Sequence, residues 1–393
     1  MRQRHSGAAP LEGVRVVDFG HWVAGPYATQ VLSQLGATVV KVEPLTGDAM
    51  SHSLPAAYAV ANRGKQSLAI DLKAPGARDV LSRLIAWSDV VAHNYRPGVA
   101  ERLGFGREQI REIDPSVIVL ESTAYGLDGP SVARPGFDPI FWAISGHAFR
   151  GGGSSGPPVC NTRLGPIDGG TGMLGAFAAL TALYRSRRTG VGGSVAVSLL
   201  DTSLFLLSEV VRDASGTFVG AAAVDRERTG PHPAEALYEL ADGWVAVLAV
   251  SEAARRQLAV ALGLTAVADR PRHEWTADDQ DAIRDRLRPM TRERLDRALV
   301  GADVWVIPCS LDAKNNILTS GSLLDAGIVV RSESDPRSTY VGFPVEFDRS
   351  QLTTGKTDVP ELGEHTDDVL HLLGFSDHEI AGMHDANVVI RRG

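Results

Sequence analysis

The sequence LEGVRVVDFGHWVAGPYATQVLSQLGATVVKVEP, residues 11–44, places a helical segment between two short apolar ones. Residues 14–19 are rich in valine, which is typical of a strand that is buried on both faces. Residues 26–35 have helical spacing, and Gly36 ends that helix before a second strand at residues 38–42. This stretch therefore predicts a strand, a covering helix and a second, parallel strand.

The same alternation continues along the chain. We expect helices at residues 78–87 and 99–103 and strands at residues 90–92 and 117–120. A further strand is expected at residues 193–199, followed by a helix at 199–211. Strands and helices that alternate at this spacing form a parallel sheet covered on both faces. The predicted fold class is therefore α/β.

The composition limits the possible classes of function. A chain of 393 residues, 44% apolar and 22% charged, is typical of a globular protein with two domains. Its net charge of −8 argues against a nucleic-acid partner, and no apolar run is long enough for a membrane span. Cys160 and Cys309 lack the spacing of metal ligands, and the N-terminus lacks the apolar segment of a secretory signal. We therefore expect a cytoplasmic protein without a metal site.

Three loops at expected strand ends carry polar residues, and parallel sheets bind ligands in such loops. Residues 20–26 read GHWVAGP, residues 62–67 read NRGKQS, and residues 93–98 read HNYRPG. The first loop is not the G-x-G-x-x-G turn of a dinucleotide site, but its small residues and Pro26 suit an anion at a helix start. The other two loops bring cations, which favours a phosphate-bearing ligand. Solvated surface charge is the ordinary alternative.

One acidic residue stands out in the stretch PPVCNTRLGPIDGGTGMLGAFAALTALYRSRRTG, residues 157–190. Residues 172–188 have the pattern of a largely buried helix, and Asp168 precedes it, followed by small residues up to Gly172. A helix N-terminus stabilises negative charge, so we expect Asp168 to be ionised at pH 7, as a carboxylate nucleophile must be. A simple helix cap is the alternative for Asp168.

Six segments together resemble the class III CoA-transferases, the family of formyl-, carnitine- and succinyl-CoA transferases and alpha-methylacyl-CoA racemases. They are residues 11–48, 62–73, 90–105, 157–190, 228–248 and 362–380, in the order of the family. The resemblance implies a large Rossmann-like parallel-sheet domain formed by residues 11–212 and 326–393, with a smaller α+β domain at residues 213–325. It also implies an interlocked homodimer.

The resemblance further implies the reaction. Asp168 matches the nucleophile that takes CoA from an acyl-CoA to a free carboxylic acid through an aspartyl anhydride and an aspartyl-CoA thioester. Neither a metal nor a permanently bound cofactor is needed, and CoA enters as substrate. The N–H groups of residues 169–172 are expected to stabilise the oxyanions. The positions that match CoA contacts are His21, Val23, Ala24, Lys73, Asn94, Tyr95 and Arg102.

The roles carried over differ among these positions. His21 and Ala24 match a loop that meets CoA, Lys73 and Arg102 match cations near its phosphates, and Asn94 with Tyr95 matches the loop beside the adenosine. Val23 stands where the formyl transferase has a glutamine near the acyl group, so we expect an apolar acyl chain. Trp22, Phe137, Phe141 and Trp142 are further candidates for the acyl wall.

Two alternatives remain open. A racemase pairs the aspartate with the histidine of a Gly-His-Asp motif, because moving an alpha proton needs an acid and a base. This chain has Gly136, Phe137 and Asp138 there, and phenylalanine carries no proton, so Asp138 is expected to be structural. The second alternative is a CoA-binding homologue without catalytic turnover.

Overall fold

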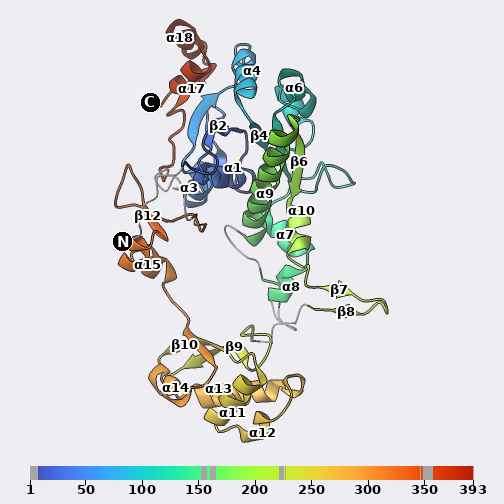
Figure 1. The fold of residues 1–393 in the computed structure, drawn as a ribbon, viewed down its shortest axis with the longest axis vertical. Helices are drawn as coiled ribbons and strands as arrows, with labels where there is room; N and C mark the ends of the chain where they lie inside the picture. Colours follow the sequence, from blue (N-terminus) through green and yellow to red (C-terminus); the bar gives the residue numbers. More distant parts are fainter. Residues whose placement is uncertain are drawn as a thin grey trace. The chain divides into compact units, whose positions relative to one another are not determined.

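The computed structural model of the chain describes residues 8–151, 157–159, 165–220, 225, 227–345, 347 and 357–392. The chain forms two compact units (Figure 1). The larger unit consists of Met1–Phe141, Thr162–Leu206 and Asn315–Gly393, and the smaller of Trp142–Asn161 and Leu207–Lys314. These divisions lie close to the predicted domain boundaries at 212/213 and 325/326, which stay predictions. Cys160 lies outside the described residues.

The larger unit is built on a seven-stranded sheet with the order β14-β3-β2-β1-β4-β5-β6. All neighbours pair in parallel except β14, which pairs with β3 in the antiparallel direction. The α/β prediction is therefore confirmed. The strands are β1 (Arg15–Asp18), β2 (Thr38–Glu43), β3 (Gln66–Ile70), β4 (Val90–His93), β5 (Ile118–Thr123), β6 (Gly193–Ser198) and β14 (Val389–Ile390).

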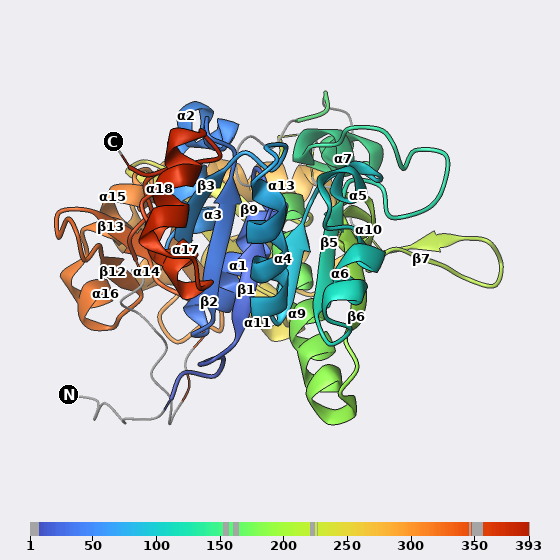
Figure 2. The same cartoon turned by 90° about the horizontal axis from the view of Figure 1, so that it is seen from above.

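Apolar side chains fill both faces of this sheet, as the apolar strands predicted. Val16 belongs to a core with α1 (Ala24–Gln34) and α9 (Pro166–Thr189), whereas Val17, one residue on, belongs to the core of the opposite face. The helices of that opposite face are α4 (Ala77–Trp87), α6 (Arg107–Ile113), α17 (Thr366–Leu372) and α18 (Asp377–Asp385) (Figure 2). The alternation follows from the two-residue period of a strand.

The strand order reverses between β1 and β4, since the chain passes from β1 to β2 and β3 on one side and to β4 and β5 on the other. At such a switch point the loops after the two strands diverge and leave a crevice for a ligand. The shorter elements that complete the larger unit are α2 (Ala49–Ser53), α3 (Pro55–Asn62), α5 (Val99–Leu103), α7 (Asp138–Ile144, its last residues in the other unit), α10 (Leu199–Phe205), α15 (Ala313–Leu318), α16 (Gly321–Asp325), β12 (Val329–Arg331) and β13 (Thr339–Val341).

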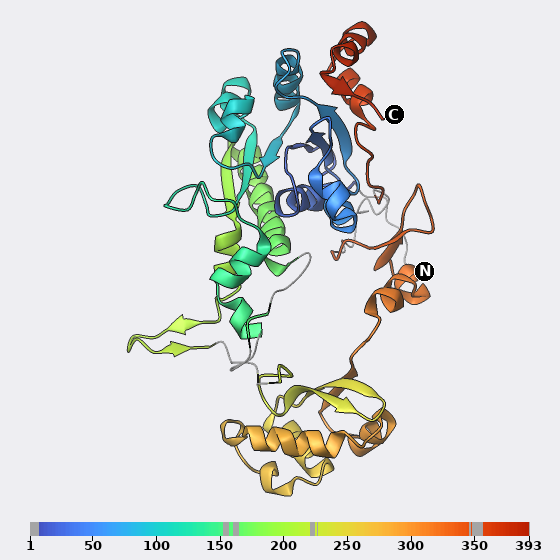
Figure 3. The same cartoon turned by 180° about the vertical axis from the view of Figure 1, so that it is seen from behind.

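The smaller unit is α+β, as predicted. Its antiparallel sheet has the order β11-β10-β9, and one face packs on helices to form a separate core (Figure 3). The elements of this unit are α8 (His147–Gly151), β7 (Val211–Arg212), β8 (Phe218–Val219), β9 (Glu235–Leu240), β10 (Gly243–Leu248), α11 (Glu252–Ala261), α12 (Thr265–Ala268), η1 (Arg272–Glu274), α13 (Ala277–Leu287), α14 (Arg292–Ala298) and β11 (Trp305–Pro308). Among the described residues, we find no helix whose length and apolar character would allow it to cross a membrane.

Candidate active site

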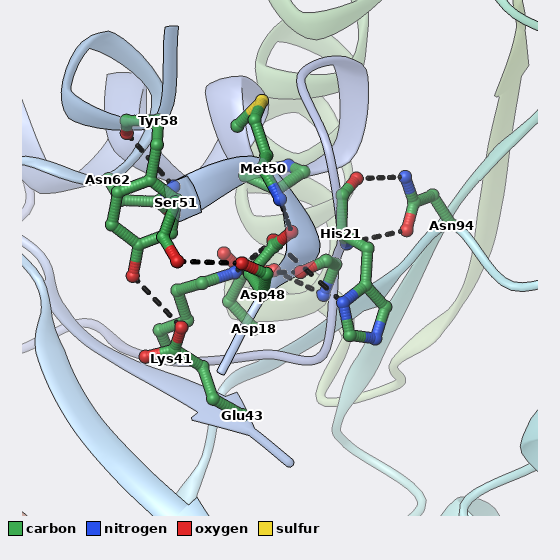
Figure 4. A network of polar contacts seen from close by, with 12 residues as sticks. Asp18, His21, Lys41, Glu43, Asp48, Met50, Ser51, Tyr58, Asn62 and Asn94 are labelled. Atoms are coloured by element: carbon green, nitrogen blue, oxygen red, sulfur yellow. Dashed lines mark hydrogen bonds and ion pairs between the residues drawn. The ribbon is translucent and has the colours of Figure 1, made fainter. Parts of the chain in front are cut away.

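The loops after β1 and β4 are joined at the switch point by one side chain. The Asn94 amide accepts a hydrogen bond from the His21 backbone N–H at 2.8 Å and donates one to the His21 carbonyl at 2.6 Å. The His21 ring nitrogen Nε2 lies 2.8 Å from the Tyr95 hydroxyl. Three of the predicted CoA-contact residues, His21, Asn94 and Tyr95, are therefore brought together. Figure 4 shows the two hydrogen bonds between Asn94 and the His21 backbone.

Buried lysines donate hydrogen bonds to the backbone at both ends of the loop at residues 20–26. The Lys41 ammonium donates to the Gly20 carbonyl at 2.8 Å, and the Lys65 ammonium donates to the Pro26 carbonyl at 2.8 Å. Both lysine side chains are fully buried. Because each ammonium group has a fixed backbone partner, the loop is tied at its first and last residues before any ligand binds.

Two buried aspartates pair with these lysines. The Asp18 carboxylate accepts a hydrogen bond from the Lys65 ammonium at 2.7 Å. The Asp48 carboxylate lies 3.3 Å from the Lys41 ammonium (Figure 4). Burial alone would raise the pKa of Asp18, but the Lys65 and Lys41 charges outweigh burial and hold that pKa below its usual value. Burial lowers the pKa of Lys65 to about 8, so the pair of Asp18 and Lys65 is charged at neutral pH. We call Asp18, Lys41, Asp48 and Lys65 the buried charge network.

His21 is neutral at pH 7. Burial lowers its pKa below the ordinary value, and the charge of Lys41 lowers it further, against opposing carboxylates. Burial raises the pKa of Tyr95 to about 12, so the phenol keeps its proton. His21 and Tyr95 thus form a neutral, hydrogen-bonded pair, which suits contact with a nucleotide better than charge neutralisation of a phosphate.

The cations of the expected loops divide into two groups. Lys73 follows the carboxyl end of β3, and Arg102 lies on α5 after β4; both are exposed, as phosphate contacts would be. The loop at residues 62–67, however, leads into the start of β3 and does not follow a strand. The prediction for that loop was therefore wrong: Lys65 is buried in the charge network, and Arg63 is buried 5.7 Å from the Tyr340 ring.

Asp168 lies inside the first turn of α9. The predicted start of this helix at residue 172 was too late, because α9 begins at Pro166 with Gly165 as its N-cap residue. The cap is supplied by another segment: the Asp138 carboxylate accepts hydrogen bonds from the N–H groups of Ile167 at 3.1 Å and Asp168 at 2.9 Å. The alternative in which Asp168 itself caps the helix is therefore incorrect, and Asp138 has the structural role that was expected.

Gly165 makes this capping possible. A Cβ atom at residue 165 would lie 1.9 Å from the Asp138 Oδ2 atom, so no larger residue fits there. Asp138 is buried, and its other oxygen, Oδ1, has no hydrogen-bond partner among the described residues. Burial raises the pKa of Asp138, against the two N–H donors that lower it.

The surroundings of Asp168 do not favour its charge. Burial, and then the neighbouring Asp138 carboxylate, raise the pKa of Asp168 to about 7. The expectation that Asp168 is ionised at pH 7 was therefore too strong, because a pKa of about 7 leaves the carboxyl group only partly ionised there. The helix N-terminus was expected to stabilise the Asp168 charge. However, the N–H groups of Ile167 and Asp168 already donate to Asp138.

The expected oxyanion donors are also occupied. Gly169 donates its N–H to the Gly165 carbonyl at 3.1 Å, and residues 170–172 lie within α9, where N–H groups bond to the preceding turn. The prediction that the N–H groups of residues 169–172 form an oxyanion hole is therefore wrong. What the small residues provide is access, since a Cβ atom at Gly169 would meet no described atom within 4 Å.

Close packing of α1 on α9 brings Asp168 to the loop at residues 20–26. A Cβ atom at Gly172 would lie 2.7 Å from the Tyr27 ring and 3.1 Å from the Ala24 carbonyl. One turn later, a Cβ atom at Gly175 would lie 3.1 Å from the Cβ atom of Ala28. The helix that carries Asp168 therefore contacts the helix start that follows the predicted CoA loop.

The expected acyl-wall residues have different positions. Val23 is only 7% exposed, and its side chain packs with Met50 and Tyr58. Because this side chain is buried, the step from Val23 to an apolar acyl chain stays a prediction. Phe141 is fully buried, and Trp142 belongs to the smaller unit.

Trp22 and Phe137 remain partly exposed and contact each other, with ring centroids 5.5 Å apart. Of the proposed wall, the larger unit therefore keeps these two aromatic rings at its surface.

Sequence reasoning missed the buried charge network. Asp18 and Lys41 are charged residues directly beside the valine pairs of two buried strands, a signal that could have identified them. Within the described part of the chain, no group of three or more histidine, cysteine, aspartate or glutamate side chains could hold a metal ion.

Comparison with known proteins supports the family resemblance. The succinyl-CoA–L-malate CoA-transferase beta subunit of Chloroflexus aurantiacus is 30% identical, over 97% of this chain and 98% of its own length. The formyl-CoA:oxalate CoA-transferase of Rhodopseudomonas palustris is 30% identical, over 96% of this chain and 97% of its own length.

Solved structures agree on the fold. A CaiB/BaiF family protein from Brucella suis superposes with a TM-score of 0.78 at 23% identity, covering 94% of this chain and 100% of its own. A hypothetical protein of Mycobacterium tuberculosis superposes with a TM-score of 0.75 at 28% identity, covering 92% of this chain and 99% of its own. The family model described as CoA-transferase family III matches residues 11–366. The chain therefore belongs to CoA-transferase family III.

Proposed function

We propose that this enzyme transfers CoA from an acyl-CoA to a free carboxylate through covalent intermediates on Asp168. CoA transfer between acyl-CoA and acids is the activity of its family. The observation that carries the proposal is the position of Asp168 on the first turn of α9, where burial and Asp138 bring its pKa to about 7. A carboxylate that is poorly stabilised yet substantially ionised at neutral pH is a reactive nucleophile.

The reaction proceeds in four exchanges. The Asp168 carboxylate attacks the thioester carbonyl, and the C–S bond breaks to give a mixed anhydride and CoA thiolate. The thiolate attacks the aspartyl carbonyl and releases the first acid, leaving an aspartyl-CoA thioester. The acceptor carboxylate attacks this thioester, which frees the thiolate and forms a second anhydride. The thiolate then attacks the acceptor carbonyl, giving the new acyl-CoA and free Asp168.

We propose that CoA binds along the carboxyl edge of the sheet. Ala24 opens α1, whose first turn has no side-chain cap, and the N–H groups of such a turn suit a phosphate. Lys73 and Arg102 follow β3 and β4, which lie three strand spacings apart, or about 14 Å, so they suit different phosphates of one extended ligand. The neutral pair of His21 and Tyr95 comes from the loops after β1 and β4 at the same edge, and Asn94 fixes the His21 backbone. Val23 contributes through its backbone.

The test is to trap the covalent intermediate. After incubation with acyl-CoA, hydroxylamine should convert the Asp168 carboxyl group into a hydroxamate, detected by peptide mass spectrometry. Asp168→Asn and Asp168→Ala should abolish transfer, because neither side chain forms an anhydride. Both should fold, since burial penalises the wild-type charge. Asp79→Asn is the matched control: Asp79 lies in the first turn of α4, and this variant should keep full activity.

Three results would contradict the proposal. Activity in Asp168→Ala would exclude an aspartyl intermediate. Uptake of deuterium at the alpha carbon of a 2-methylacyl-CoA in heavy water, without transfer to an added acid, would instead favour the racemase. We expect no uptake, because Phe137 has no exchangeable side-chain proton. CoA binding without either reaction would indicate a non-catalytic homologue.

A further inference from the structure

Trp22 and Phe137 form an aromatic pair at the surface of the larger unit. Their rings meet edge to face, with an interplanar angle of 84°. Trp22 is 36% exposed and Phe137 is 50% exposed, whereas neighbouring Phe141 is fully buried. Removing large aromatic side chains from water is favourable. An exposed aromatic pair therefore indicates a surface that contacts an apolar group of a ligand.

The backbone holds Trp22 in an unfavourable conformation. Its φ of 61° lies in the left-handed region, where a bulky side chain is strained. Strain of this kind persists where the surrounding structure imposes it, and it gathers at binding sites. Here the imposing contacts are those on its neighbour His21, whose N–H and carbonyl are both bonded to Asn94.

Both residues lie on segments that contact the first turns of α9. Phe137 directly precedes Asp138, whose carboxylate accepts the N–H of Asp168. Trp22 lies two residues before Ala24, whose carbonyl faces Gly172 on the next turn of α9. The aromatic pair is therefore carried by the two segments that hold the N-terminal turns of the helix with the proposed nucleophile.

We propose that Trp22 and Phe137 form the wall of the acyl site and that the substrates are acids with an apolar acyl group, aromatic or with a chain of medium length. The proposal rests on the proposed function, because it assigns the acyl group that Asp168 receives. It does not depend on Val23, whose side chain is buried elsewhere.

The test is isotope exchange between an acyl-CoA and its own labelled acid, measured for hexanoyl-CoA, benzoyl-CoA, acetyl-CoA and succinyl-CoA. We expect kcat/KM for hexanoyl-CoA or benzoyl-CoA to exceed that for succinyl-CoA by at least about 100-fold, the scale of pocket discrimination against an unmatched group. Equal or better exchange with succinyl-CoA would overturn the acyl assignment while leaving the transferase function intact. No exchange with any of the four would instead count against the proposed function itself.

Two variants test the wall. Trp22→Gly removes the ring and suits the positive φ, and Phe137→Leu removes aromatic area while keeping an apolar side chain. In each, the ratio of kcat/KM for hexanoyl-CoA to that for acetyl-CoA should fall, by about 10- to 100-fold in Trp22→Gly. Trp22→Asn, which also tolerates the left-handed region, repeats the test if the glycine variant folds poorly. An unchanged ratio in folded variants would exclude these rings from the acyl site.

Discussion

At the scale of single residues, the pair of Asp138 and Asp168 couples structure to reactivity. Asp138 uses its carboxylate to cap α9, and the same negative charge raises the pKa of the proposed nucleophile. A neutral cap would hold the helix equally well. The charged cap adds a carboxylate whose field keeps Asp168 basic, and a more basic carboxylate is the better nucleophile.

The Asp168 pKa predicts a pH dependence. Only ionised Asp168 attacks, so kcat/KM for acyl-CoA should rise with pH to a plateau, with a midpoint near pH 7. In Asp138→Asn the amide oxygen can still accept the N–H groups, but the charge is gone, so the midpoint should move to lower pH. The measurement is a pH–rate profile of both enzymes. An unmoved midpoint in a folded Asp138→Asn variant would show that Asp138 does not act on the nucleophile through its charge.

At the scale of elements, the crossing of α1 and α9 determines whether the proposed nucleophile and CoA loop meet. The contact requires Gly172, because a Cβ atom there would press on the backbone carbonyl of Ala24 as well as on the Tyr27 ring. Gly169 lies in the same helix but faces open space. Substitutions at these two glycines therefore test two effects separately: the packing of α9 at Gly172, and its helical propensity at Gly169.

We expect Gly172→Ala to lower the free energy of unfolding by about 1–3 kcal/mol, the usual cost of overpacking. It should also raise KM for acyl-CoA, because α1 must shift. Gly169→Ala is the matched control and should raise the free energy of unfolding by about 0.5–1 kcal/mol, since alanine favours the helix. The measurement is denaturant unfolding together with steady-state kinetics. Equal effects of both substitutions on stability would show that the crossing does not depend on close approach.

The buried charge network belongs to the same scale, because it joins β1, β2 and α1. Lys65→Met would leave Asp18 buried with one fewer cation, and we expect a loss of about 3–5 kcal/mol in the free energy of unfolding. Lys73→Met removes an exposed lysine, so its stability should change by less than about 0.5 kcal/mol while KM for acyl-CoA rises and kcat stays similar. A large loss of stability in Lys73→Met, or none in Lys65→Met, would contradict this division.

The sequence predicts most elements of the larger unit because buried strands and amphipathic helices have clear periods. The start of α9 could not be read locally, because its cap comes from Asp138, about one hundred ångströms of extended chain away and 30 residues earlier. The role of Lys65 was misread for a related reason. A lysine beside glycine looks like surface charge until the partner, Asp18, is known to lie 47 residues earlier in the sequence.

At the scale of the whole molecule, both chain ends form one unit and the middle of the chain forms another. The larger unit leaves aromatic side chains uncovered on α9 and α10. Phe177 and Tyr184 are 65% and 66% exposed and share one face of α9, and Phe205 on α10 is 62% exposed. Monomeric proteins rarely expose so many large apolar side chains on adjacent elements.

We therefore expect the homodimer that the family resemblance implies, with this aromatic face covered. Light scattering should give about twice the mass of one chain, because isologous burial of an apolar face is the usual route to a stable pair. If the chains are interlocked, they cannot separate without unfolding, so the mass should stay constant on dilution from micromolar to nanomolar concentration. Mixing two separately purified, differently tagged preparations should then yield no mixed dimers under native conditions but should yield them after joint refolding. The mass of a single chain would contradict the predicted dimer. Rapid exchange of chains under native conditions would be consistent with a dimer but would exclude interlocking.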